Sequence, residues 1–398
     1  MNDRPLIAHV LYRLDTGGME RMLVTLINHT HQRYHHVVIC LEGHGALRDQ
    51  IEPDDVMCVV LGKKPGKDWG CYFRLWRILR KLKPALVHTY NIGALDVAPI
   101  ARLAGVRHVV HAERGRDAAD PRGESRKYRL LRRWLLPLID RYLPVSRDLQ
   151  NWLIEKVGIP SSRIVCIPNG IDVASFAPAS ESGVRPLLGS FAPPGTVLIG
   201  TVGRLDAVKD QAGLIAAFCH LCEALPDERE RLCLVLVGEG PQRAVLESRI
   251  ADTGLSAQIR LLGNRNDVAA LLAEFDVFVL SSIAEGMPGV VLEAMAVGLP
   301  VVATAVGGVG EVVAAGVTGT LVPASDAEAL AGALASHVLD AGLRKSYGAA
   351  GRERVMARFS LQTMLSAYTA LYDELLSDAH PQHQQAVTAT RVSRQKEH

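Results

Sequence analysis

Residues 276–304 read DVFVLSSIAEGMPGVVLEAMAVGLPVVAT, and this stretch decides the fold class. Its first run, 276–282, has a continuous apolar centre, VFVL, and predicts a buried strand. Gly286, Pro288 and Gly289 suit a loop that turns from a strand into a helix, with the proline near the first helical turn. An apolar helix, a turn and a second β-branched run follow. Buried strands joined by a helix are typical of a parallel sheet that is covered on both faces.

The same unit recurs along the chain on either side of one break. Before the break, strands are predicted at 6–12, 36–43, 56–62, 85–91, 107–113, 142–146 and 164–170, with a helix at 18–29. After the break, strands are predicted at 197–203, 232–238, 258–263, 276–282 and 300–305. The break itself, 171–196, is rich in Pro, Gly and Ser, as linkers are. The pattern predicts an α/β chain with two Rossmann-like, doubly wound domains that face each other across a cleft.

The expected domains are 1–175 and 190–358, with a helix at 360–377 that rejoins the first domain. Residues 379–398 are polar and aperiodic, which predicts a disordered tail. A length of 398 residues with 48% hydrophobic residues suits two globular domains. The N-terminus lacks the layout of a signal peptide, and no apolar stretch predicts a membrane span.

The net charge of +2 conceals two halves of opposite sign. Residues 1–180 carry 27 Lys and Arg against 18 Asp and Glu, whereas residues 181–398 carry 17 against 24. The basic half suits an anionic membrane or an anionic substrate, and no motif for nucleic acid accompanies it. The helical stretches 71–83 and 126–136 mix apolar and basic positions. This mixture fits either a membrane surface or the solvated face of a packed helix.

The seven cysteines are scattered along the chain. Cys219 and Cys222 form one C-x-x-C on a predicted helix, but a structural zinc site needs about four ligands and no second pair is near. Neither a metal site nor a disulfide framework is predicted, and the protein is expected in a reducing cytoplasm.

In open α/β sheets, ligands bind beyond the carboxyl ends of the strands. Gly17 and Gly18 follow the first strand, where they form either a close backbone approach to an anion or only a tight turn. Arg204 and Lys209 follow the first strand after the break and suit a diphosphate, although a solvated pair would look the same. The segment GEGPQR at 238–243 lacks the third glycine of a dinucleotide motif, which disfavours a NAD-dependent oxidoreductase.

Two glutamates frame the centre of the opening stretch, Glu285 in the predicted loop and Glu293 inside the helix. Both could point into one cleft and accept hydrogen bonds from the hydroxyls of a sugar or ribose. Alone, Glu285 could equally be a favourable charge at a helix N-terminus. Glu293 is harder to explain without a partner, because its neighbours are apolar. Gly307 and Gly308 follow the next strand as a further backbone anion site or as another turn.

Taken together, these motifs resemble those of the family 4 glycosyltransferases, which have the GT-B fold. The matching segments occur in the family's order and span nearly the whole chain: GGMER (17–21), VSRDL (145–149), IPNGID (167–172), VGRLDAVKD (202–210), EGMPGVVLEAMAVGLPVVAT (285–304) and GGVGEVV (307–313). The E-x7-E pattern, from the first glutamate of 285–304 to the second, is the most specific of them. The segments HTYNIGALD, RGRDAADPRGESRKYRLLRR and GRLDAVKDQAGL look like those of sugar transferases encoded with PEP-CTERM/exosortase and exopolysaccharide systems.

The resemblance implies a retaining transfer from a nucleotide-diphosphate sugar, with no cofactor and no metal. Carried over by position, Glu293 would hold the ribose hydroxyls and Glu285 would contact the donor sugar. Arg204 and Lys209 would hold the diphosphate. The departing diphosphate would help to deprotonate the acceptor on the same face of the sugar.

The remaining implied contacts come from loops at the ends of strands. Those that would lie against the donor are Gly17, Gly18 and Gly286. Those that would meet the base and the diphosphate through the backbone are Gly263, Asn264, Arg265, Gly307 and Gly308. The acceptor would enter from the basic first domain.

One position departs from the family's pattern. Relatives often carry a histidine just beyond the strand at 107–113, where it contacts the donor sugar. Here the segment reads VVHAERG, so Arg114 stands at that position and His111 lies earlier, within the strand. Arg114 and His111 are both candidate catalytic residues, as is Glu285. Either Arg114 faces the cleft and binds phosphate, or a shift brings His111 there. A buried strand histidine is the alternative for His111.

The predicted function is the transfer of a sugar from a nucleotide-diphosphate sugar to a glycan or lipid-linked acceptor in exopolysaccharide or cell-envelope synthesis. The expected place is the cytoplasm, with peripheral contact at the inner face of the cytoplasmic membrane. One alternative is a non-catalytic, nucleotide-sugar-binding component of a polysaccharide assembly system, because of Arg114. Another is a nucleotide-sugar isomerase or hydrolase on the same fold, although no separate acid–base set is evident.

Overall fold

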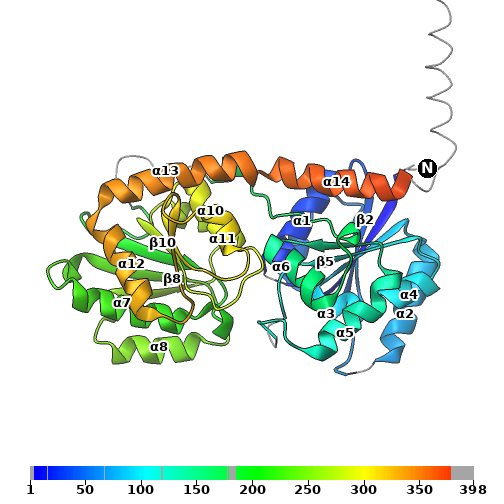
Figure 1. Cartoon of the computed structure of the whole chain (residues 1–398), viewed down its shortest axis with the longest axis horizontal. Coiled ribbons are helices and arrows are strands. Elements are labelled where there is room, and N and C mark those ends of the chain that lie inside the picture. Colours follow the sequence, from blue (N-terminus) through cyan, green and yellow to red (C-terminus); the bar gives the residue numbers. More distant parts are fainter. Residues whose placement is uncertain are drawn as a thin grey trace, which may run out of the picture.

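The computed structural model describes residues 4–15, 17–66, 68–117, 120–176, 178 and 185–377; the predicted tail at 379–398 lies outside these ranges. Two α/β domains lie side by side, and each is built on a six-stranded parallel sheet (Figure 1). The predicted fold class, two Rossmann-like doubly wound domains, is therefore confirmed.

The first sheet comprises β1 (Leu6–Leu14), β2 (His35–His44), β3 (Met57–Val60), β4 (Leu86–Tyr90), β5 (His108–Glu113) and β6 (Arg141–Pro144). The second comprises β7 (Val197–Val202), β8 (Leu232–Val237), β9 (Ile259–Gly263), β10 (Val277–Leu280), β11 (Val301–Thr304) and β12 (Gly319–Val322). Their orders are β3-β2-β1-β4-β5-β6 and β12-β11-β10-β7-β8-β9. Each order reverses at one point, between β1 and β4 and between β7 and β10. At such switch points α/β proteins bind their ligands.

Helices cover both faces of each sheet (Figure 1). Those of the first domain are α1 (Gly18–Thr30), α2 (Trp69–Leu82), α3 (Asn91–Leu95), α4 (Ala98–Leu103), α5 (Arg126–Leu135) and α6 (Arg147–Trp152). Those of the second are α7 (Gln211–Ala224), α8 (Arg243–Asp252), α9 (Val268–Leu272), α10 (Gly289–Val297), α11 (Val309–Val312) and α12 (Ala327–Leu339). The chain ends with α13 (Ala341–Arg358) and α14 (Leu361–Ser377). Within the described ranges, no helix combines the length and the apolar character that a membrane crossing requires.

Two expectations about strands differ from the structure. Residues 164–170 run beside β6 with one isolated bridge, from Ile164 to Tyr142, and with two backbone hydrogen bonds, from the N–H groups of residues 165 and 167, which is too little pairing to make a strand. The sequence does not predict β12, because its four residues are too short an apolar run beside a glycine. The other predicted strands agree with the structure to within two residues at each end.

The chain crosses between the domains twice, and the two crossings lie side by side. The Ile171 N–H donates to the Phe359 carbonyl at 2.9 Å, and the Leu361 N–H donates to the Ile171 carbonyl at 2.9 Å. After the second crossing, α14 packs into the core of the first domain, so that α13 and α14 together run along both domains (Figure 1). On α14, the Tyr372 hydroxyl lies 2.8 Å from Nδ1 of His88 on β4.

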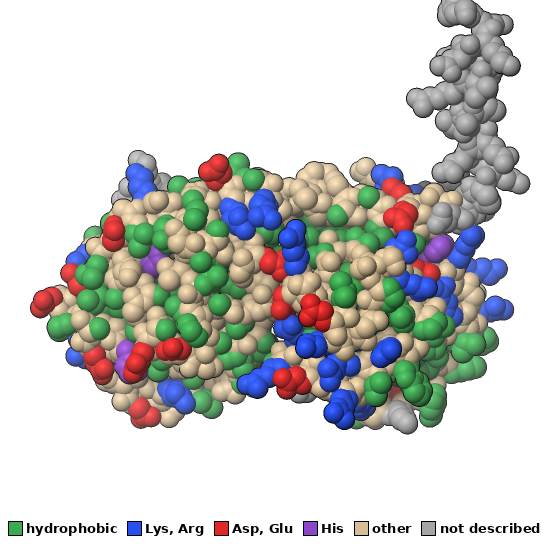
Figure 2. Space-filling model, in the orientation of Figure 1, with side chains coloured by type: hydrophobic (Ala, Val, Ile, Leu, Met, Phe, Trp, Pro, Cys, Tyr) green, Lys and Arg blue, Asp and Glu red, His purple; other side chains and the backbone are tan. Residues whose placement is uncertain are grey.

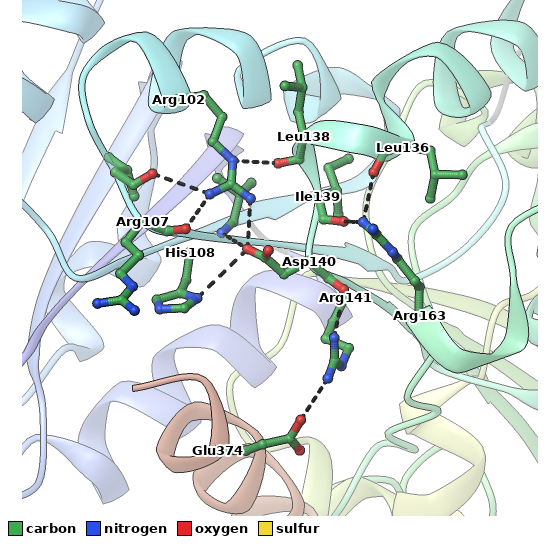
Figure 3. A network of polar contacts seen from close by, with 12 residues as sticks. Arg102, Arg107, His108, Leu136, Leu138, Ile139, Asp140, Arg141, Arg163 and Glu374 are labelled. Atoms are coloured by element: carbon green, nitrogen blue, oxygen red, sulfur yellow. Dashed lines mark hydrogen bonds and ion pairs between the residues drawn. The ribbon is translucent and has the colours of Figure 1, made fainter. Parts of the chain in front are cut away.

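A polar network at the start of β6 fastens the surrounding elements to the first sheet (Figure 3). The Asp140 carboxylate accepts hydrogen bonds from Nη2 of Arg102 at 2.9 Å and from the Val109 N–H at 2.7 Å. Beside it, Nη2 of Arg141 donates to Glu374 on α14 at 2.7 Å. The last helix is thus tied to the first domain by polar contacts as well as by its apolar face.

Three histidines form a hydrogen-bonded row in the core of the first domain. Nε2 of His9 lies 3.0 Å from Nδ1 of His36, and Nδ1 of His9 lies 3.0 Å from the Tyr90 hydroxyl. That hydroxyl in turn lies 3.1 Å from Nδ1 of His88. Burial lowers the pKa of each of the three histidines, that of His36 to about 4. The row is therefore neutral in the folded protein at neutral pH.

We expect the first domain to lose stability as the pH falls from about 6.5 toward 4, because the unfolded chain then takes up protons that the buried row does not. Each histidine that stays neutral in the folded protein adds about 1.4 kcal/mol to the loss of stability for each pH unit in this window. Denaturant titrations across it measure the effect. His36→Gln should reduce the loss, whereas exchange of the exposed His220 should not. An equal loss in the His36 variant and the wild type would contradict the assignment.

Candidate functional site

The switch point of the second sheet gathers three of the predicted side chains. Arg204 and Lys209 follow β7, and Glu285 follows the neighbouring strand β10. In the first domain, Gly17 is the N-cap of α1, directly after β1 and therefore at the other switch point. These four residues, predicted from three separate motifs, thus leave the sheets at the two points where ligand binding is expected.

Lys209 and Glu285 form a short ion pair. Nζ of Lys209 lies 2.6 Å from Oε1 of Glu285, and the Ser282 hydroxyl donates to the same oxygen at 2.6 Å. The two side chains are only 26% and 10% exposed, so solvent screens the pair less than it screens a surface pair. Gly307, at φ +50°, packs against the Glu285 carbonyl where a side chain would overlap it. Because an ammonium group has three donors, Lys209 can still reach an oxygen of a ligand.

Glu293 lies on α10, in the next element after this pair. It is half-buried, and among the described residues its carboxyl group has neither a hydrogen-bond nor an ion-pair partner. Burial raises the pKa of Glu293, and the positive charge of Arg21, on α1 of the first domain, opposes that rise. A half-buried carboxylate without a partner costs stability, which a ligand with hydroxyl donors would offset.

The first turn of α1 faces the same site from the other domain. Burial raises the pKa of Glu20 to about 7, nearby Asp15 adds to the rise, and Arg204 of the second domain opposes it. The Arg204 side chain is exposed, and Oδ2 of Asp206 lies 3.7 Å from its Nε. The guanidinium can therefore turn to a phosphate. Sequence reasoning did not single out Glu20 or Arg21, although both stand in the quoted GGMER segment.

The predicted base-binding loop lies at the end of β9, on the same edge of the sheet. Gly263 has φ +71°, and its carbonyl accepts a hydrogen bond from the Gly238 N–H at 2.8 Å. Asn264 is exposed, and Nε of Arg265 donates to Asp267 at 2.8 Å. These residues are placed where the prediction expects them, and their contacts with a base stay a prediction.

Of Gly307 and Gly308, where either a backbone anion site or another turn is predicted, the structure corrects the anion site for Gly308 alone. The Gly308 N–H donates to the Gly286 carbonyl at 3.0 Å, so this donor is already used. The two glycine loops pack on each other because neither carries a side chain at the contact. Gly18, by contrast, is exposed with open space beside it.

The prediction of His111 as a catalytic residue is wrong, because its side chain is fully buried in β5. Its Nδ1 lies 2.8 Å from the Thr89 hydroxyl and its Nε2 lies 3.1 Å from Glu113. Glu113 is held in turn by Arg132, at 2.5 Å from Nε and 3.1 Å from Nη2. Burial alone would raise the pKa of Glu113, but Arg132 and His111 outweigh it and bring it to about 2. The buried strand histidine, given above as the alternative, is what the structure shows.

Arg114 also differs from its predicted role as a phosphate ligand. Its Nη1 donates to the Tyr368 hydroxyl of α14 at 3.2 Å, and its Nη2 donates to Oδ1 of Asn169. Its backbone N–H donates to Oδ1 of Asn91 at 2.8 Å. The guanidinium is therefore engaged within the protein, beside the crossing between the domains, and the structure does not support phosphate binding by it.

Several contacts close the two domains on each other around the loop 285–289. Nδ2 of Asn169 donates to the Met287 carbonyl at 2.9 Å. The Gly286 Cα lies so close to the Arg114 carbonyl that a Cβ would overlap it. The sequence gives no sign that Asn169 has this part, because an Asn-Gly pair after a proline is typical of an ordinary turn.

A cavity of about 630 Å³ opens elsewhere between the domains. Its lining residues are Arg147, Gln150, Asn151, Cys166, Pro168, Glu311, Arg358 and Phe359. None of the predicted donor residues lines it, so the cavity does not mark the candidate site. Oε1 of Glu311 accepts the Asp148 N–H at 3.0 Å across the domain boundary, which assigns this glutamate to the domain contact.

Comparison with known families matches both halves of the chain. Residues 16–175 match the model of the family described as Glycosyltransferase Family 4, and residues 190–354 match that described as Glycosyl transferases group 1. An Escherichia coli protein, UDP-Gal:alpha-D-GlcNAc-diphosphoundecaprenol alpha-1,3-galactosyltransferase, is 32% identical over 61% of this chain and 63% of its own. The lipopolysaccharide core biosynthesis mannosyltransferase LpcC of Rhizobium leguminosarum bv. viciae is 30% identical over 64% of this chain and 70% of its own.

Solved structures agree in fold. HepE of Anabaena, in complex with UDP and glucose, superposes with a TM-score of 0.80 over 93% of this chain and 100% of its own, at 22% identity. WaaG, a glycosyltransferase of lipopolysaccharide biosynthesis, superposes with a TM-score of 0.72 over 93% of this chain and 99% of its own, at 19% identity. At these identities the likeness shows the fold alone. Together with the family matches and the relatives, it establishes that the chain belongs to the family 4 glycosyltransferases of the GT-B fold.

Proposed function

We propose that this protein transfers a sugar from a nucleotide-diphosphate sugar to a glycan or lipid-linked acceptor in the synthesis of an exopolysaccharide or cell-envelope polysaccharide. The observation that carries the proposal is Glu293. It is a half-buried carboxylate without a partner in the described chain, on a helix that begins at the switch point of the second sheet. Such a group suits the ribose of a nucleotide, whose two hydroxyls can both donate to it.

The charged groups around Glu293 would bind the other parts of the donor. Arg204 and Lys209 would neutralise the diphosphate, and Glu285, held by Ser282 and Lys209, would meet the donor sugar. The bond from the anomeric carbon to the diphosphate oxygen breaks, and the acceptor oxygen bonds to that carbon on the same face. The acceptor proton passes to the departing diphosphate. In this proposal the side-chain cations do the neutralising, and no metal or cofactor is required.

A screen of UDP-, GDP- and other nucleotide-sugars for thermal stabilisation tests the proposal. A donor at about a hundred times its dissociation constant should stabilise the fold by about 2.7 kcal/mol. The stabilising compound is then incubated with the enzyme, and release of the nucleoside diphosphate is followed. Binding without release, even with membrane extracts as a source of acceptor, would favour the non-catalytic alternative. No stabilisation by any donor would contradict the proposal.

We further propose that the first domain binds an anionic membrane surface through α2 and α4, which would suit a lipid-linked acceptor. Trp69 and Phe73 on α2 are 73% and 59% exposed, and Leu103 at the end of α4 is 72% exposed. Trp76 joins them, since its Nε1 lies 3.4 Å from the Leu103 carbonyl. Hydrophobic side chains gather over this end of the first domain in Figure 2, with basic side chains nearby. Aromatic and basic groups together fit the interface of an anionic bilayer.

We expect the protein to bind vesicles that contain anionic phosphatidylglycerol at low salt, and to leave them at high salt, because the basic half supplies much of the attraction. Trp69→Ser with Phe73→Ser should weaken binding at least about tenfold, since two large apolar side chains are lost. Leu339→Ser is the control, because this residue is equally exposed but lies in the second domain. Cosedimentation measures the effect. Equal binding by both variants would show that this patch does not touch the membrane.

A further inference from the structure

We propose that Asn169 is a positioning residue, whose side-chain amide holds the Met287 carbonyl and so sets the loop that carries Glu285 when the domains are closed. The inference rests on the proposed function of that loop. Its evidence is a continuous chain of hydrogen bonds that starts on α14, passes through Arg114 and Asn169, and ends at Met287 in the second domain.

The chemistry of the partners fixes which way the amide points. A guanidinium group can only donate, so Arg114 must face the carbonyl oxygen of the Asn169 side chain. The amide nitrogen is therefore turned toward the Met287 carbonyl, which can only accept and lies 2.9 Å away. The Tyr368 hydroxyl, 3.2 Å from the other nitrogen of Arg114, holds the guanidinium from the far side. Arg114 thus orients the amide, and within this chain of hydrogen bonds Asn169 makes the step from the first domain to the second.

Asn169 stands directly before the crossing from one domain to the other. Gly170 packs so closely on Ser360 and Met364 that a Cβ would overlap both, and Ile171 pairs with Phe359 and Leu361. The backbone on either side of the crossing is therefore fixed. A change of the angle between the domains would move Asn169 relative to Met287. Through this hydrogen bond, the position of the loop therefore depends on whether the domains are closed.

The loop 285–289, which Asn169 holds, is short and carries the Glu285 carboxylate. Glu285 lies two residues before Met287, and Pro288 directly follows Met287. The Met287 side chain is buried in the core of the second domain, so its carbonyl has little freedom once Asn169 binds it. The Glu285 carboxylate is positioned from one side by Lys209 and Ser282. Asn169 supplies the restraint from the opposite domain.

The test is Asn169→Asp in the full chain. An aspartate keeps the oxygen that Arg114 binds but puts a negative oxygen, in place of the N–H donor, against the Met287 carbonyl. We expect kcat for release of the nucleoside diphosphate from the stabilising donor to fall by about tenfold to a hundredfold, as for a small misplacement of a reacting group. The KM, the stabilisation by the nucleoside diphosphate alone and the unfolding temperature should stay near wild type, because Glu293 and the Arg114 contact are untouched.

Asn28→Asp is the matched control. Asn28 also bridges two groups with its amide, donating to the Gln50 carbonyl at 2.9 Å and accepting the Glu52 N–H at 3.1 Å, but it lies away from the site. Its exchange should leave kcat unchanged. Arg114→Lys is the second variant, because an ammonium group cannot hold Asn169 and Tyr368 with the same fork. It should lower kcat with little change in KM.

The possible results distinguish a positioning role of Asn169 from a merely structural one. An Asn169→Asp enzyme with wild-type kcat overturns the inference, and so does a variant in which kcat, nucleotide binding and unfolding temperature all fall together, since that pattern marks a merely structural residue. If this variant does not fold, Arg114→Lys decides by the same criteria. If the wild type neither binds nor turns over any nucleotide-sugar, the proposed function fails, and this inference with it.

Discussion

Replacement of Glu293 by Gln should abolish binding of the nucleotide-sugar while leaving the free protein at least as stable as the wild type. A carboxylate that accepts two ribose hydroxyls contributes about 1.5–3 kcal/mol per hydrogen bond, so its loss should cost about two to four orders of magnitude in affinity. In the free protein the same group is a half-buried charge without a partner in the described chain, and its removal relieves that cost.

The stability of the Glu293→Gln variant should also depend on pH differently from that of the wild type. Because burial raises the pKa of Glu293, the folded protein binds a proton more tightly here than the unfolded chain does. This carboxyl group therefore destabilises the fold as the pH rises through its raised pKa, and the glutamine variant lacks that contribution. Thermal shifts with and without donor, at several pH values, measure both effects.

Glu223→Gln is the control for charge, since this glutamate is 77% exposed in its side chain and lies on α7. It should bind donor as the wild type does. An undiminished donor shift in the Glu293 variant would remove the ribose assignment, and with it the observation on which the proposed function stands.

Replacement of Arg132 by Ala should destabilise the first domain by about 3–5 kcal/mol, because it leaves Glu113 buried without its cation. The side chains of both residues are almost fully buried, at 3% and 1% exposure, so water cannot replace the lost partner. The pKa of Glu113, now about 2, should rise in the variant. In the wild type this carboxylate stabilises the fold above its ordinary pKa of about 4.5, and the contribution is lost as the pH falls toward 2. Denaturant unfolding measures the change.

The double variant Glu113→Gln with Arg132→Met should recover a large part of the loss, because a buried pair replaced as a whole leaves no lone charge. Arg133→Ala, the exposed neighbour on the same helix, should stay within about 0.5 kcal/mol of wild type. A loss of less than about 1 kcal/mol for Arg132→Ala would show that Glu113 finds another partner or water.

The fold was predictable from the sequence because its main signal is local. The β-branched runs, the glycine turns after them and the break near 171–196 each act over a few residues, and together they indicate two doubly wound domains. The misses have equally local causes. β12 is four residues long, and the run 164–170 pairs with β6 through one isolated bridge and two backbone hydrogen bonds, too few to make a strand.

The candidate site was predictable only in part. The residues that follow strands β7 and β10, Arg204, Lys209 and Glu285, meet as expected, because parallel strands end at one edge. The position of a side chain on a strand is set by its neighbours in space, which one sequence does not show. His111 is satisfied by Thr89 and Glu113 from its own sheet. Asn169 and Arg114 meet only because the fold brings together segments that lie 55 residues apart in the chain.

The packing of α14 has a consequence for how the protein is made. This helix supplies Met364, Tyr368 and Tyr372 to the core of the first domain, yet it is translated after the whole second domain. The first domain therefore completes its core only when its last helix has left the ribosome. Until then, the surface that α14 covers is exposed on the nascent chain, and we expect chaperones that bind apolar segments to engage it there. A truncation that ends at Arg358 would keep the protein permanently in that state.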